Sequence, residues 1–187
     1  MILSVDTGLN NYGLVVLDPE TDKVKYVNVI QTKKSKVKGV KVSADYEARM
    51  RCILNQIKKV IDKYQVTKIY GEMPSFGFKS ANAALSLGIG ATLIVSISTL
   101  LDIPAVWCTP MDIKNRFEGG GSKEEIMRDV CGFYGWPITY KTVKFKKKGK
   151  PDRQDPTYHV MGEQLSKGYF EHIADAIAAY HICKEIV

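Results

Sequence analysis

The chain has 187 residues, enough for one compact domain with a buried core. Hydrophobic residues make up 45% of it and charged residues 25%, which is ordinary for a soluble globular protein, and the net charge is +7. Met1 leads directly into a strand-like run without a targeting signal, so we expect a cytoplasmic protein and not a secreted one. The four cysteines form no CxxC pair, so we expect reduced, buried thiols and no zinc site.

Three strands are predicted within the first 32 residues. Their apolar runs are MILSVDTG, NYGLVVLD and KVKYVNVIQ, and a turn-rich DPETD separates the second from the third. Gly8 and the pair Asn10–Asn11 suit a tight connection between the first two runs, because glycine and asparagine tolerate positive φ. We expect an antiparallel meander.

A basic segment, residues 33–41 (KKSKVKGVK), follows with five lysines and no acid. Residues 141–150 (KTVKFKKKGK) carry six more, and without these eleven lysines the net charge of +7 would be −4. Clustered lysines gain affinity for nucleic acid by releasing counterions from phosphates, but two solvated loops would have the same composition. Charge alone leaves both interpretations open.

From Ser43 onward helical spacing alternates with short strands, which predicts an α/β protein: a mixed five-stranded sheet with helices on both faces. We expect one domain over residues 1–187, with a basic insertion at about 137–167. The predicted elements are a helix capped by Ser43, a strand at Val66–Glu72, a helix at Ser80–Leu101, a strand at Ile103–Cys108, a helix opening at Thr109–Pro110, a helix from a Ser122 capping box to about Tyr134, and an amphipathic helix at Tyr169–Val187.

The run Ser80–Leu101 has no charged residue and is long enough to cross a bilayer. It also contains Asn82, serines, threonines and glycines, and no second hydrophobic span accompanies it. We therefore predict a helix buried on most sides and no membrane partner.

Carboxylates end two of the apolar strands, at Asp6 and Glu72, where a charge is costly to bury unless it is paired or binds metal. His172 and Asp175 lie three residues apart on one face of the last helix. Magnesium prefers oxygen ligands, and a pair of such ions can activate water and stabilise the leaving oxygen of a phosphodiester. We predict that these four residues are catalytic and bind metal; His172 could orient water, act as a base, bind the metal, or only bond a neighbouring carboxylate.

Four motifs resemble the RuvC family of Holliday junction resolvases: D-T-G-L-N-N-Y-G at 6–13, E-M-P at 72–74, A-N-A-A-L-S-L-G at 81–88 and H-I-A-D-A-I-A at 172–178. The resemblance covers roughly residues 1–136 and 168–187. It implies an RNase H-like fold, a homodimer, four-way-junction DNA as the partner, and paired Mg²⁺-dependent nicks that leave 5′-phosphate and 3′-hydroxyl ends. It also implies two Mg²⁺ per active site, with Mn²⁺ able to substitute.

Within that resemblance, Lys114 in the D-I-K-N-R run matches a basic position near the scissile phosphate, and Lys123 falls near another. Phe76 or Phe78 would be the aromatic wedge that unstacks bases, although core packing of one of them is an equal alternative. Lys79, which follows them, is predicted to contact DNA as well. The basic insertion adds predicted phosphate contacts that raise affinity without reading bases. These are Lys144, Lys146, Lys147 and Lys148.

Three other functions fit less well. GGGSK at 119–123 lacks the phosphate-loop pattern, so we expect no nucleotide cofactor. An actin-like or sugar-kinase ATPase would need a second domain of similar size, and a non-catalytic branched-DNA-binding module would have no reason to hold like charges together. A broader debranching nuclease, acting on forks, flaps or three-way junctions, is the main alternative to a resolvase.

Overall fold

A five-stranded sheet forms the centre of the molecule. The computed structural model describes residues 1–73, 80–116, 122–143 and 153–186. The first three strands form an antiparallel meander, and β4 and β5 join it in parallel with β1. The predicted mixed five-stranded sheet is therefore confirmed, with the order β3 (Val24–Gln31), β2 (Asn11–Leu17), β1 (Ile2–Asp6), β4 (Lys68–Glu72) and β5 (Ala105–Cys108).

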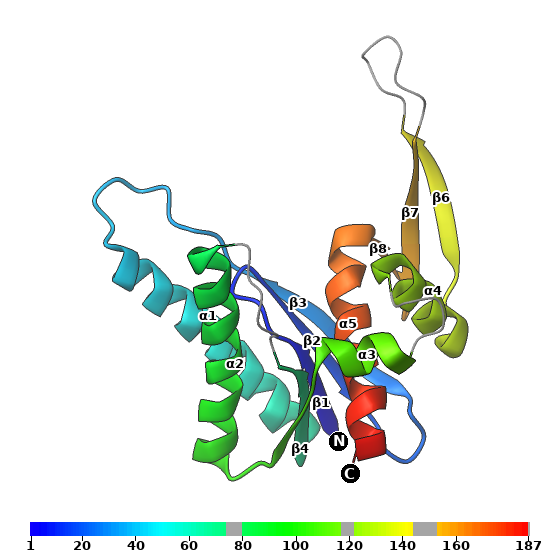
Figure 1. Ribbon diagram of the computed structural model, residues 1–187, viewed down its shortest axis with the longest axis horizontal. Coiled ribbons are helices and arrows are strands. Elements are labelled where there is room, and N and C mark those ends of the chain that lie inside the picture. Colours follow the sequence, from blue (N-terminus) through cyan, green and yellow to red (C-terminus); the bar gives the residue numbers. More distant parts are fainter. Residues whose placement is uncertain (74–79, 117–121, 144–152, 187) are drawn as a thin grey trace.

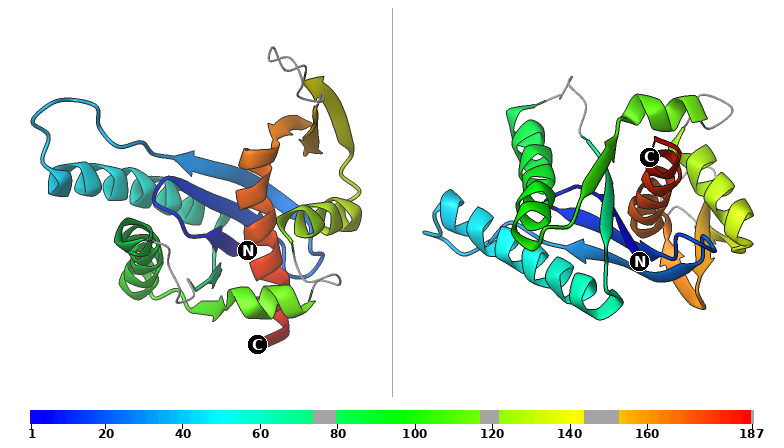
Figure 2. Two further views of the ribbon diagram at one scale, coloured as in Figure 1. Left: turned by 45° about the horizontal axis from the view of Figure 1, so that its top comes forward. Right: turned by 90° about the horizontal axis from the view of Figure 1, so that it is seen from below.

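Helices cover both faces of this sheet, as predicted (Figures 1 and 2). On one face, α1 (Val42–Tyr64) and α2 (Ala81–Leu101) enclose one apolar core with the sheet. On the other face, α3 (Pro110–Arg116), α4 (Lys123–Tyr134) and α5 (Lys167–Ile186) enclose a second core. Successive side chains of each buried strand pack into one core and then the other, because successive residues of a strand point to opposite faces of the sheet.

The basic insertion contains a second sheet, of three antiparallel strands. These are β6 (Ile138–Val143), β7 (Arg153–Val160) and β8 (Glu163–Ser166), and Figure 1 shows β6 and β7 projecting beyond α5. Tyr158 of β7 stacks on Phe170 of α5 with ring centroids 4.3 Å apart, which attaches this sheet to the second core. Pro156 falls where β7 pairs with β6 alone, so its missing N–H is tolerated there.

The prediction that residues 80–101 are buried on most sides is wrong. Five residues of α2 are buried, Gly90, Ala91, Leu93, Ile94 and Ile97, and they pack toward the sheet. The opposite side of the helix is exposed, including Leu85 and Leu100. Among the described helices, α2 is the one that is long and apolar enough to cross a membrane. Only 28% of its most apolar 18-residue stretch is buried in the protein.

The last helix is more deeply buried than an amphipathic helix would be, which corrects that prediction. Ten of its residues are buried, from Phe170 to Cys183, so apolar side chains surround it. Contacts with the sheet, α4 and the second sheet explain this, because they cover the helix from several directions. Ser4 of β1 donates a buried hydrogen bond of 2.6 Å to the backbone oxygen of Ala176, fixing α5 on the sheet.

Of two predicted helix N-caps, one is confirmed and the other is wrong. The capping box of α4 is confirmed, with the Ser122 hydroxyl accepting from Glu125 N–H and the Glu125 carboxylate accepting from Ser122 N–H. The Ser43 cap is wrong: α1 begins at Val42, and its N-cap is Lys41, two residues before Ser43 and without a side-chain hydrogen bond. Three of the four free cysteines are buried as expected, but Cys52 is exposed on α1.

Candidate active site

Asp6 and Glu72 lie side by side at one edge of the sheet. They end β1 and β4, which are neighbouring parallel strands paired in register up to the residues just before them. Ser4 and Tyr70, two residues earlier on these strands, face α5 and its core. Because side chains alternate along a strand, Asp6 and Glu72 also point to the α5 side.

The helix α5 brings His172 to the same place. A Cβ atom at Gly13 of β2 would lie 2.3 Å from the backbone oxygen of His172 and 3.2 Å from the Cβ of Asp6, so the helix passes directly over the glycine. At this approach, the imidazole Nδ1 of His172 lies 2.6 Å from Oδ2 of Asp6. The hydrogen bond to Asp6 raises the pKa of His172, although burial of the ring opposes it.

Three carboxylates share a low-dielectric environment with unbalanced negative charge. Burial raises the pKa of Glu72 to about 7, and repulsion from Asp6 adds to the shift. Burial likewise raises the pKa of Asp175, with further repulsion from Asp6 and Glu72. A cation bound beside Glu72 and Asp175 would lower the pKa of both, since an opposite charge favours the ionised form.

Two lysines contribute positive charge at the rim. Lys123, the first residue of α4, places its Nζ 3.7 Å from Oδ2 of Asp175 and also binds Glu171. Burial lowers the pKa of Lys123, but its contacts with Glu171 and Asp175 outweigh burial and leave that pKa raised. Lys114 on α3 is exposed, and its charge lowers the pKa of Glu72, so both lysines face the carboxylates.

The structure thus brings Asp6, Glu72, His172, Asp175 and the two predicted basic residues, Lys114 and Lys123, to one edge of the sheet. The remaining predicted DNA-binding residues lie outside the described residues. They are Phe76, Phe78, Lys79, Lys144, Lys146, Lys147 and Lys148.

Sequence reasoning missed two residues that shape the site. Gly13 admits the backbone of α5, and its place in D-T-G-L-N-N-Y-G, seven residues after Asp6, could have indicated this role. Glu171 holds Lys123, but a glutamate beside a histidine on a helix carries no distinguishing pattern.

The donor set suits a hard divalent cation. Three carboxylates and an imidazole are ligands that Mg²⁺ or Mn²⁺ accepts. Burial raises the pKa of Glu72 and of Asp175, and a cation bound beside them would lower both values. Within the described ranges, however, no group of three or more His, Cys, Asp or Glu side chains is close enough to hold a metal ion. The chemistry of the residues fits a divalent ion, while their side chains are not gathered in coordination geometry.

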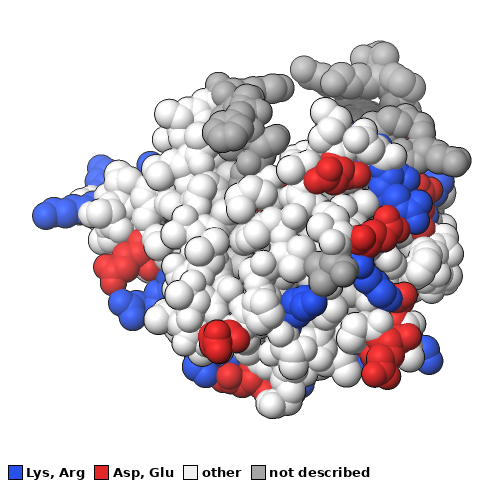
Figure 3. All heavy atoms as spheres, turned by 60° about the horizontal axis from the view of Figure 1, so that its bottom comes forward, with Lys and Arg blue, Asp and Glu red and all other residues white. Residues whose placement is uncertain are grey.

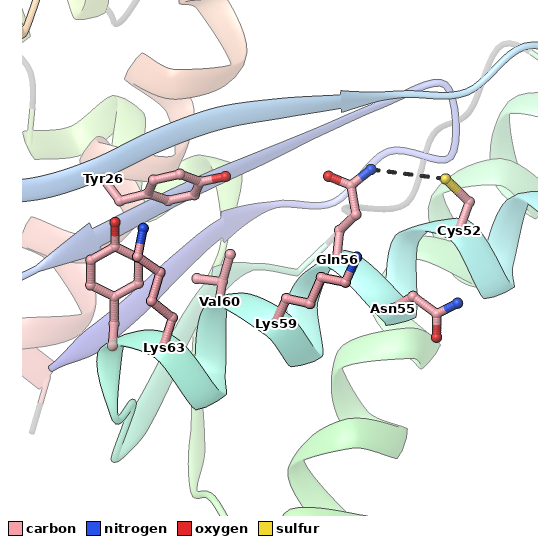
Figure 4. A pocket seen from close by; sticks show the side chains of 8 residues that line it. Tyr26, Cys52, Asn55, Gln56, Lys59, Val60 and Lys63 are labelled. Carbon is pink, nitrogen blue, oxygen red and sulfur yellow. Dashed lines mark hydrogen bonds between the residues drawn. The ribbon is translucent and has the colours of Figure 1, made fainter.

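A separate pocket of about 430 Å³ lies between β3 and α1 (Figure 4). Tyr26 and Tyr64 line one end with their rings tilted and centroids 5.4 Å apart, and Lys59 and Lys63 flank them. None of the residues that line it is acidic, and none is a predicted site residue. The carboxylates at the sheet edge, rather than this pocket, form the candidate active site.

Comparisons with known proteins agree with this geometry. No model of a known protein family matches the chain. Over 130 residues it is 26% identical to the crossover junction endodeoxyribonuclease RuvC of Christiangramia forsetii, a match that covers 68% of this chain and 64% of the relative, so the chain spans less than two thirds of that relative's length. The protein of the same name from Methylobacillus flagellatus is 28% identical over 131 residues, which cover 69% of this chain and 72% of that relative.

Solved structures share the fold. RuvC of T. thermophilus in complex with a Holliday junction substrate superposes with a TM-score of 0.63 at 16% identity, covering 97% of this chain and 90% of that one. The yeast mitochondrial Holliday junction resolvase Ydc2 has a TM-score of 0.57 at 12% identity, covering 98% and 78%. The predicted RNase H-like fold and the resemblance to the RuvC family are confirmed.

Proposed function

We propose that this RuvC-like chain is a divalent-metal-dependent endodeoxyribonuclease that resolves Holliday junctions by paired symmetric nicks, leaving 5′-phosphate ends. The observation that carries the proposal is the convergence of Asp6, Glu72 and Asp175 at the edge of an RNase H-like sheet, with His172 bound to Asp6. Its curated relatives are crossover junction endodeoxyribonucleases, and one solved neighbour is bound to a Holliday junction.

Asp6, Glu72, Asp175 and His172 would hold Mg²⁺, two ions per site, with Mn²⁺ as a substitute. Bound there, the metal would supply charge stabilisation at the scissile phosphate and an acidified water. Protonated Glu72 and Asp175 cannot serve as carboxylate ligands, so a bound ion would have to displace their protons. We therefore expect the protein to bind Mg²⁺ well above pH 7 and to bind it more weakly below pH 7.

The chain's own residues contribute orientation and charge. Nδ1 of His172 faces Asp6, which leaves Nε2 as the ring nitrogen that could orient a water or take its proton. Lys114 and Lys123 add positive charge beside the carboxylates, where a phosphate would otherwise be repelled. Glu171 positions the Lys123 side chain through an ion pair.

A homodimer is the form in which symmetric nicks are possible, because each copy would cut one strand. The exposed side of α2 supports such a contact: Leu85, Val95 and Leu100 are exposed there, and no charged residue lies between 81 and 101. Thr92 and Thr99 bond their hydroxyls to their own helix, at Gly88 O and Val95 O, which leaves their methyl groups for packing. Figure 3 shows a broad area without charged side chains on this side of the molecule.

The experiment that tests this function compares a four-way junction, a fork, a flap and a linear duplex on one gel, with Mg²⁺ and with EDTA. We expect symmetric cuts in the junction that require Mg²⁺ and end in 5′-phosphates. Cutting of forks and flaps at a similar rate would favour the broader debranching nuclease, an alternative that the basic insertion supports because phosphate contacts do not distinguish branch types. Absence of cutting in every substrate, with binding retained, would leave a non-catalytic branched-DNA-binding module.

A further inference from the structure

The loop between β3 and α1, residues 33–41, is a dense exposed positive patch that the proposed active site does not use. Its five lysines are all exposed, and its segment contains no acid. In the part of the chain that the structure describes, none of them forms an ion pair, whereas Lys25, Lys58 and Lys123 each bind a carboxylate. These lysines are Lys33, Lys34, Lys36, Lys38 and Lys41.

Although its lysines are exposed, the loop is fastened at its base by a buried polar network. Asp45 accepts a hydrogen bond of 2.7 Å from the backbone N–H of Ser35, and lies 3.7 Å from Arg49. Arg49 donates from Nε to the hydroxyl of Thr32 at 2.9 Å and from a second nitrogen to the side-chain oxygen of Asn10. Asp45 and Arg49 are 8% and 9% exposed, so this network is almost fully removed from water.

Burying an ion pair is a poor source of stability, because desolvation offsets most of the attraction. Here the pair fixes a position instead. Asn10 lies in the turn that follows β1, four residues after Asp6, and its backbone oxygen accepts from Thr32 N–H at 2.9 Å. The lysine loop is therefore tied to the same turn that leads away from the first carboxylate of the candidate active site.

The position of the loop suits a long charged ligand. Figure 1 shows it projecting on the side of α1, while β6 and β7 project on the other side of the molecule. A duplex laid across the sheet edge toward α1 would meet the loop, and each lysine that neutralises a phosphate would release a counterion. A small anion would not need five lysines spread over nine residues.

We propose that residues 33–41 contact the phosphate backbone of a DNA arm that leaves the candidate active site on the β3 side, and that Asp45 and Arg49 position this loop. The inference rests on the proposed function, since it assigns a surface to the same DNA substrate. We expect this contact to be independent of DNA sequence, because lysines that bind phosphates do not contact the bases.

The test measures binding to a four-way junction by fluorescence anisotropy, in EDTA and on an Asp175→Asn background that cannot cut. One variant carries K33Q, K34Q, K36Q, K38Q and K41Q. The control, K23Q, K25Q, K58Q, K59Q and K63Q, removes the same number of positive charges from the β2–β3 turn, the start of β3 and the C-terminal part of α1. We expect the loop variant to bind about 10-fold or more weakly near 100 mM salt and to lose about 2–4 from the slope of log K against log salt, and the control to change by less than about 3-fold.

Equal losses in the two variants would show that net charge alone matters and would overturn the inference. The proposed function is judged separately, by whether the unmodified protein cuts branched DNA. A protein that cuts junctions but binds them equally well with and without the loop lysines would refute the loop contact and leave the nuclease intact.

The positioning role of Arg49 is tested by Arg49→Lys, which keeps the charge but not the two-pronged contact with Thr32 and Asn10. We expect weaker junction binding in the parent protein and no further loss in the loop variant, because the two changes act through the same contact. Thermal unfolding of each variant separates this from loss of fold. Equal losses of affinity in both backgrounds would contradict the positioning role.

Discussion

At the scale of single residues, Asp6 interacts with His172 and with the two other carboxylates of the candidate site. It binds His172, and its charge adds to the effect of burial in raising the pKa of Glu72 and of Asp175. Replacing it should therefore remove a proposed metal ligand and also break the contact with His172.

We predict that Asp6→Asn lowers junction cleavage by more than about 100-fold, since even partners of metal ligands cost about 10–100-fold in activity. Junction binding in EDTA should stay within a few-fold of the unmodified protein, measured by gel shift. Asp129→Asn, which removes an exposed acid from α4, is the matched control and should cut normally. An Asp6→Asn protein that cuts at the normal rate would remove Asp6 from the site.

The pH dependence of stability follows from Glu72. Its pKa rises from 4.5 to about 7 on folding, so between these pH values the unfolded chain has lost a proton that the folded protein keeps. The free energy of unfolding should fall as pH rises through this window, by on the order of 2–3 kcal/mol from Glu72 alone. His172 acts in the same direction, because its raised pKa gives stability that is present below pH 6.5 and lost as pH rises through the folded value.

Urea denaturation in EDTA at pH 5, 6, 7 and 8 measures this slope. Glu72→Gln should flatten it and be more stable than the unmodified protein at pH 8, because no charge is then buried. Identical slopes for the two proteins would mean that Glu72 ionises normally in the folded state.

At the scale of elements, the close approach of α5 to β2 depends on Gly13. We predict that Gly13→Ala destabilises the protein by about 1–3 kcal/mol or more, because the new Cβ would overlap the backbone oxygen of His172. Gly132→Ala on α4 is the control: its Cβ meets nothing within 4 Å, and alanine in a helix should stabilise by about 0.5–1 kcal/mol. Urea denaturation measures both changes, and equal stabilities would contradict the close approach.

The elements that could be predicted from the sequence are those whose residues follow a regular pattern. The strands of the central sheet and the Ser122 capping box were predictable, since buried strands are apolar runs and a cap has fixed spacing. The strands β6 to β8 were not, because they are polar, are interrupted by Pro156, and bury few side chains. Their pairing depends on docking to α5, which local sequence does not encode.

The two apolar helices show why hydrophobicity alone does not predict burial. The more hydrophobic one, α2, exposes a whole side, while α5 is covered by the sheet, α4 and β7. The carboxylates of the site could be predicted from the strand ends. Their pairing with His172 required the path of α5, which Gly13 permits.

At the scale of the whole molecule, the uncharged side of α2 predicts the oligomeric state. Leu85→Glu together with Val95→Glu should convert a dimer to a monomer in sedimentation equilibrium, because charges placed opposite their own symmetry mates repel and cannot be hydrated in a packed interface. Met161→Glu changes an equally exposed residue in the β7–β8 turn and should leave the mass unchanged. An unmodified protein that sediments as a monomer would contradict the dimer.

The dense packing around α5 also has a consequence for the protein during synthesis. A nascent chain that has reached β7 already contains Asp6 and Glu72, but it lacks the helix that supplies His172 and Asp175. If the site works as proposed, such partial chains have no nuclease activity. We therefore expect a chain that ends before residue 172 to leave branched DNA uncut.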